Sequence, residues 1–198
     1  MQPMGLRFSD EGLPGPFDVS HAYRITMRIA LAMAILPGLG TGFLLVVVVG
    51  FGLSMFAAWP ELAQAHGQIQ ALGFVLLFIV AVALQLFPRF LAAPLQHPQR
   101  AIWAACALVL ALVLRLLAQP LEPDILRTTL LVLATAGVPV GLVIAGWTFH
   151  GLPRASIQPS SGPSAWWRRF VAVGGTALGG VLILWVWSGA RLASRLWT

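Results

Sequence analysis

The sequence predicts an all-α fold, a polytopic membrane bundle of five transmembrane helices with its N-terminus in the cytoplasm. Three observations predict it. The 198 residues are 59% hydrophobic and only 9% charged, whereas about a quarter of residues are charged in an ordinary soluble domain. Apolar runs recur along the chain at about the length that a helix needs to cross a bilayer. Arginine and tryptophan gather at the ends of these runs, as is typical of membrane interfaces.

The first residues differ from the rest in composition. Residues 1–21 are polar, contain Asp10, Glu11 and Asp18, and are interrupted by three prolines. They lack the early apolar region and the small-residue cleavage site of a signal peptide. We therefore expect an N-terminal arm outside the bilayer, followed by a five-span bundle over residues 22–198.

The first span is expected at about 28–58. Its charge-free stretch is longer than the roughly 20 residues of a perpendicular helix, and Pro37 interrupts it near its first third. Proline is tolerated in membrane helices when neighbouring groups satisfy the freed carbonyl. The excess length therefore favours one kinked or tilted span, since a two-pass hairpin would leave each arm too short.

The remaining spans follow from apolar runs bounded by prolines and polar residues. The second, third, fourth and fifth are expected at about 62–87, 101–117, 125–149 and 169–187. In the fourth, Gly137 and Gly141 have the small-xxx-small spacing that allows close contact between helices. The linker at 155–165 is rich in Ser, Gly and Pro, which is typical of a loop.

The arginines predict the orientation of the bundle. All twelve basic residues are Arg, for a net charge of +6, and cytoplasmic loops carry an excess of basic residues. A cytoplasmic N-terminus places eight arginines inside, namely Arg7, Arg24, Arg28, Arg89, Arg100, Arg154, Arg168 and Arg169. Four remain outside. The same distribution assigns the charge to lipid headgroups, and we expect no nucleic-acid partner. The expected location is a bacterial inner membrane.

Several activities are excluded by missing residues. All six carboxylates lie in the arm or near span ends and lysine is absent, so the sequence lacks a proton relay through the bilayer. Cys106 is the single cysteine, which excludes an intrachain disulfide and Cys-based zinc spacing. No Ser/His/Asp set is assignable. His21, His97 and His150 flank spans without ligand spacing.

His66 is the residue that the sequence singles out. His66, Gln70 and Gly73 are spaced i, i+4 and i+7 and so share one helix face. An ionisable side chain inside a span is a candidate functional site, and a neutral imidazole is a natural iron ligand. His66 could serve as an axial heme ligand, with Gly73 leaving room for a flat ring. The alternative is a polar interfacial histidine that bonds to a neighbouring helix.

The second span resembles the corresponding span in two related groups of membrane proteins. The residues that carry the resemblance are the run AHGQIQALGF at 65–74 and Pro88-Arg89. In the NnrS family of heme- and copper-containing proteins, this span opens with a His-Ala-His-type motif and ends in proline followed by a basic or polar residue. In heme-copper oxidase catalytic subunits, a His-Gly-x-x-Met-type motif supplies a heme ligand. Arg115 also resembles an arginine common at that place in NnrS-like proteins. The resemblance covers about residues 58–118.

The resemblance implies heme as cofactor, with His66 as the metal ligand and with Gln70 and Arg115 among the cofactor-binding residues. It also implies a role in electron transfer or in the nitrogen-oxide response. The family has about twice as many spans, and its second motif histidine would fall at Gln68 or Ala65. The later oxidase histidines are missing, so we expect no enzymatic activity from this chain alone.

Two other functions stay open. One is a cofactor-free accessory subunit of a larger respiratory or photosynthetic membrane complex, with other membrane subunits or a second copy as partner. The other is a small-solute channel or carrier, which the lack of ionisable residues inside the spans disfavours.

Overall fold

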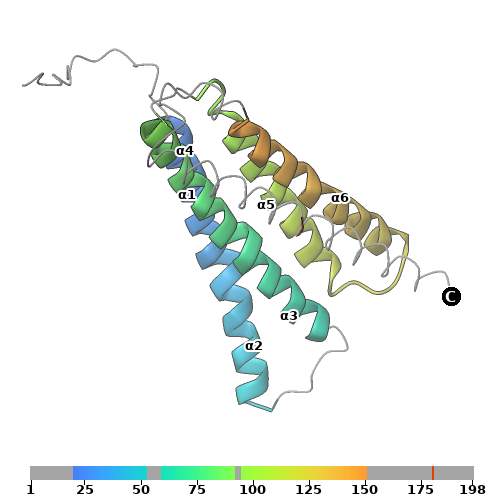
Figure 1. The fold of residues 1–198 in the computed structure, drawn as a ribbon. Coiled ribbons are helices and arrows are strands. Elements are labelled where there is room, and N and C mark those ends of the chain that lie inside the picture. Colours follow the sequence, from blue (N-terminus) through green and yellow to red (C-terminus); the bar gives the residue numbers. More distant parts are fainter. Residues whose placement is uncertain (1–19, 53–58, 92–94, 151–179, 181–198) are drawn as a thin grey trace, which may run out of the picture.

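The computed structural model describes residues 20–52, 59–91, 95–150 and 180, and these residues form helices without any strand (Figure 1). Two of the segments are π-helical, η1 and η2. The elements in order are α1 (Ser20–Met33), η1 (Ala34–Leu39), α2 (Gly40–Gly50), α3 (Trp59–Gln68), η2 (Ile69–Leu76), α4 (Leu77–Leu91), α5 (Arg100–Ala118) and α6 (Ile125–Thr148).

These elements join into rods that are long and apolar enough to cross a membrane. Within the described ranges there are four, over His21–Gly50, Trp59–Arg89, Arg100–Ala118 and Ile125–Thr148. The all-α class is confirmed for this part of the chain, together with a set of helices suited to a membrane. The fifth span expected at 169–187 and nearly all of the arm expected at 1–21 lie outside the described residues.

The first rod differs from its expected limits of 28–58. Among the described residues it already includes the turns before residue 28, where Ala22 and Thr26, like Ala30 further on, face the protein interior while Arg24 and Arg28 are exposed. It ends at Gly50. Gly52 then adopts a φ of 60°, a left-handed conformation that glycine takes easily and that commonly terminates helices.

Pro37 lies inside this rod without breaking it. Proline has no N–H to donate, and its ring clashes with the carbonyl one turn earlier. Here Pro37 lies inside η1, whose wider π-helical turn accommodates the ring. The Thr41 hydroxyl donates to the Pro37 carbonyl oxygen at 2.6 Å. The rod is therefore one continuous helical segment over His21–Gly50, without the reversal that a two-pass hairpin needs.

The closest helix pair is α5 with α6. A Cβ added at Gly141 would lie 2.6 Å from Leu108 Cγ, and one at Gly137 would lie 2.9 Å from Ala111 Cβ. The two glycines therefore let Leu108 and Ala111 approach the α6 backbone, which confirms the packing role predicted from their spacing. Leu108, Ala111, Val138 and Leu142 form a core cluster with Ala30 of α1 and Leu77 of α4.

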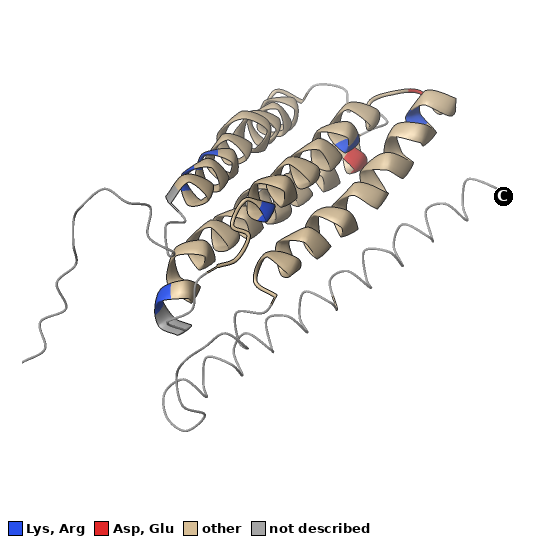
Figure 2. Ribbon diagram, turned by 90° about the horizontal axis from the view of Figure 1, so that it is seen from above, with Lys and Arg blue, Asp and Glu red and all other residues tan. Residues whose placement is uncertain are grey.

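Charge divides the bundle into two unlike ends. The described acids are Glu61, Glu122 and Asp124, and the acidic positions lie only toward one end of the bundle (Figure 2). Asp124 caps α6 there by accepting from the Arg127 amide at 2.7 Å, as N-cap aspartates do. At the other end lie Arg24, Arg28, Arg89 and Arg100, at the start of α1, the end of α4 and the start of α5.

Candidate functional site

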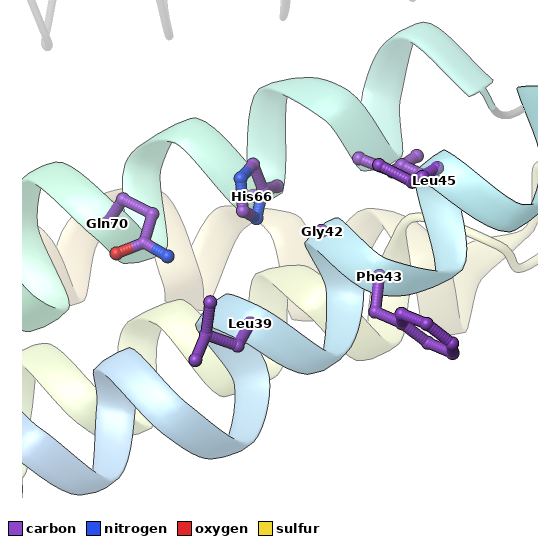
Figure 3. Close-up of a pocket in the computed structure, with 7 residues that line it drawn as sticks. Leu39, Gly42, Phe43, Leu45, His66 and Gln70 are labelled. Atoms are coloured by element: carbon purple, nitrogen blue, oxygen red, sulfur yellow. The ribbon is translucent and has the colours of Figure 1, made fainter.

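His66 lies in the last turn of α3, where its imidazole faces α2. A Cβ added at Gly42 would lie 2.9 Å from His66 Cε1 and 3.5 Å from His66 Nε2. The ring therefore occupies the space that a larger residue at position 42 would need. Figure 3 shows the imidazole directed from its helix toward Gly42 on the neighbouring one.

Gln70 repeats this arrangement one turn further on, in η2. A Cβ at Gly38 would lie 2.7 Å from Gln70 Nε2. Gly38 and Gly42 are four residues apart, as are Gln70 and His66, so two polar side chains pack over two glycines. The sequence predicted that His66 and Gln70 share a face, and the structure brings them together along the contact with η1 and α2.

Gly73 does not have the expected surroundings. A Cβ at this position would lie 2.9 Å from Met33 Cε and 3.2 Å from Leu112 Cδ1. Met33 and Leu112 are both buried and belong to one core cluster. The room beside Gly73 is therefore taken by helix packing, and the prediction that it accommodates a flat ring is wrong.

A groove opens beside His66 and Gln70, with a volume of about 670 Å³. Its other walls come from η1 and α2, through Leu39, Gly42, Phe43, Leu45 and Val46. Phe43 is 71% exposed, so the groove is open toward the outside of the bundle. The sequence did not point to these walls, because their residues are ordinary apolar residues of a membrane span.

The imidazole has one nitrogen without a protein partner. His66 Nδ1 is buried and makes no hydrogen bond in the described structure, although buried polar atoms are normally paired. Because Nδ1 is covered by protein atoms, the groove combines apolar walls with the remaining, uncovered part of the His66 imidazole, a side chain that can bind a proton or a metal ion.

Arg115 lies elsewhere. It is buried in α5, 7% exposed, and its Nη2 donates to Gln64 Oε1 at 3.3 Å. Gln64 and His66 are two residues apart on one helix, which places them about 200° apart around its axis. The structure therefore separates Arg115 from the groove that His66 and Gln70 line.

Polar residues of α3 accompany Arg115 on that side of the helix. Glu61, Gln64 and Gln68 share a face by their spacing, and the second carboxylate oxygen of Glu61 and the amide oxygen of Gln68 are buried without a hydrogen-bond partner in the described structure. This polar face was missed in the sequence, where the 61, 64, 68 spacing was the signal that could have revealed it.

The remaining histidines do not form a site. His21, His97 and His150 are exposed, and the described residues contain no group of three or more His, Cys, Asp or Glu placed to hold a metal ion. His66 is thus the histidine that lines the groove.

The glycine notch at His66 predicts the outcome of a matched pair of substitutions. Gly42→Val forces the imidazole out of its place and should lower the free energy of unfolding by about 1 to 3 kcal/mol, the usual cost of overpacking. Gly40→Val places the same side chain in the same helix where nothing lies within 4 Å. Thermal unfolding in detergent compares them, and equal losses in the two variants would contradict the packing described here.

Within the described residues, four long apolar helices with outward-facing leucine, valine and phenylalanine support the class of polytopic helical membrane proteins. Comparisons with known protein families, with characterised proteins and with solved structures find no match.

Proposed function

We propose that the chain is a heme-binding protein of a bacterial inner membrane, related to NnrS and heme-copper proteins, with His66 as the iron ligand. One observation carries the proposal: the His66 imidazole lines an open apolar groove. The resemblance of the second span to those proteins adds a functional class, namely electron transfer or the nitrogen-oxide response. The chain is not an enzyme by itself.

The residues at the groove fit such a cofactor. Its volume of about 670 Å³ is within the usual range for small-molecule sites, and its walls are mainly hydrophobic, as cofactor sites are. Since Nδ1 of His66 is buried, Nε2 is the ring nitrogen that would hold the iron of such a cofactor. A bound heme would add one-electron exchange and small-gas binding at this place.

The protein's own residues then have distinct tasks. His66 would hold the iron, the Gln70 amide would offer a polar contact, and Phe43 would contribute to the apolar wall. Arg115 acts at a distance, because its bond to Gln64 holds α3 against α5 and so fixes the helix that carries His66. Since no other described histidine lines the groove, a second iron ligand would come from another subunit, a second copy or a small gas.

The proposed orientation has five spans and a cytoplasmic N-terminus. The end with Arg24, Arg28, Arg89 and Arg100 has no described acidic residue, which is the pattern of a cytoplasmic face. His66 then lies toward the outer half of the membrane, near the end of the bundle that carries Glu61.

A reduced-minus-oxidised absorption spectrum of the purified full-length protein tests the proposal. We expect a Soret and an α-band change after dithionite reduction of protein expressed with heme available. A flat difference spectrum, in protein that remains folded by circular dichroism, would contradict heme binding.

A second candidate function is a cofactor-free accessory subunit of a larger membrane complex. The observation that favours it is the packing of His66 over Gly42 and of Gln70 over Gly38, which gives both side chains a structural role without any cofactor. This candidate requires comigration with a larger assembly after solubilisation in mild detergent. Migration as a heme-free monomer from native membranes would count against it.

A further inference from the structure

We call the end with Arg24, Arg28, Arg89 and Arg100 the basic end of the bundle. One of these arginines makes a specific contact there. The guanidinium carbon of Arg100 lies 4.4 Å from the centroid of the Trp147 ring. Arginine over the face of tryptophan is a favourable cation–π pair. Arg100 is therefore held at a fixed place at the start of α5, beside the end of α6.

The turn before α5 supports this position. The Arg100 amide donates to the His97 carbonyl oxygen at 3.1 Å, and the Ala101 amide donates to the Pro98 carbonyl oxygen at 3.1 Å. Ala101 is completely buried in the core cluster that joins α1, α4, α5 and α6 at this end. Arg100 is thus attached to a hydrogen-bonded turn and lies next to a buried residue of the core cluster.

Other cations lie on the outer sides of the helices at the same end of the bundle. Phe87 of α4 packs edge-to-face on Phe149, with ring centroids 5.4 Å apart, which brings the end of α4 next to the end of α6. Arg89 follows Phe87 by two residues, so it lies about 200° around the α4 axis from that contact and is exposed. Arg24 follows Ala22, a member of the cluster, by two residues and is likewise exposed on the outer side of α1.

Apolar surface lies directly beside these charges. Trp147 is 56% exposed on α6 and Trp103 is 69% exposed on α5. Tryptophan is typical of the level where acyl chains meet headgroups. A fixed cation beside exposed aromatic rings matches a molecule with an anionic head and hydrocarbon tails.

We propose that this end of the bundle binds an anionic phospholipid, with the phosphate at Arg100, the acyl chains against Trp147 and Trp103, and Arg89 adding to the positive charge of the same end. The described part of this end has four arginines and no acid, so the charge complementarity favours an anionic lipid over a zwitterionic one. Each arginine near an anionic membrane surface contributes about 1 kcal/mol, which corresponds to about a five-fold change in affinity. The site is independent of heme binding.

Native mass spectrometry of the full-length protein with added phosphatidylglycerol or phosphatidylcholine tests the proposal. We expect phosphatidylglycerol to bind more tightly, and Arg100→Gln and Arg89→Gln each to weaken it about five-fold. Arg127→Gln is the matched control, because it removes the same charge at the opposite end of the bundle. The affinity of the Arg127→Gln variant for phosphatidylglycerol should equal that of the wild-type protein.

Two results would overturn the proposal. One is equal binding of the two lipids by the wild-type protein. The other is equal weakening of phosphatidylglycerol binding by Arg100→Gln, Arg89→Gln and Arg127→Gln, which would assign the lipid to net charge and not to this site. Arg89 is exposed, so Arg89→Gln gives the answer even where Arg100→Gln disturbs the turn before α5.

Discussion

Replacing Gly141 with alanine should destabilise the protein by about 1 to 3 kcal/mol, because an added methyl group has no space between α5 and α6. The new Cβ would lie 2.6 Å from Leu108 Cγ, 2.9 Å from Leu108 Cδ2 and 3.2 Å from the Leu108 backbone nitrogen. A rotamer change at Leu108 cannot relieve all three contacts, since one of them involves the main chain. The two helices must therefore separate.

Gly146→Ala is the matched control for this substitution. Gly146 lies on the same helix, and a Cβ there would meet nothing within 4 Å. Alanine has a higher helix propensity than glycine, so this variant should be as stable as the wild type or slightly more so. Thermal unfolding in one detergent measures both. A Gly141→Ala variant as stable as Gly146→Ala would show that α5 and α6 are not packed through this glycine.

Replacing His66 with glycine should remove the proposed heme, lowering the heme retained per chain at least ten-fold. The substitution takes away the only described imidazole that lines the groove and leaves its apolar walls intact. Hydrophobic contact alone retains a lipophilic ring weakly in competition with lipid, because acyl chains are as apolar as the groove. The pyridine hemochrome assay gives the heme content of the purified protein.

His97→Ala provides the control, since His97 is exposed and lies in the turn before α5. Its heme content should equal that of the wild type. A loss of equal size in the two variants would mean that heme is held elsewhere, or that it is bound nonspecifically by the detergent-solubilised protein.

Much of the fold could be predicted because a bilayer imposes strong constraints on sequence. A span must be apolar over a set length, and its backbone polar groups must be satisfied internally, which leaves helices as the solution for runs of this kind. Three of the four described rods therefore lie near their expected positions, and the first, at His21–Gly50, is shifted toward the N-terminus. Gly137 and Gly141 could be assigned to helix contact because small residues matter at fixed spacing.

The rest depended on interactions between distant residues. The first rod includes residues before 28, where Ala22 and Thr26 are buried, and hydropathy does not record such burial. Its end at Gly50 depends on the turn at Gly52.

At the candidate site, the shared face of His66 and Gln70 followed from spacing alone. The residues that His66 and Gln70 contact could not be predicted from spacing, because Gly42 and Gly38 belong to another rod. The same holds for Met33, which fills the space beside Gly73. The partner of Arg115 was unpredictable for the same reason, since Gln64 is 51 residues away.

The most direct test of the imidazole at position 66 as the iron ligand is chemical rescue. His66→Gly leaves a space for free imidazole in the groove, so adding imidazole and heme to the purified variant should restore the wild-type Soret band. The same addition to the His97→Ala protein should change nothing. Full heme content in His66→Gly without imidazole, or a wild-type protein that takes up no heme, would contradict the assignment.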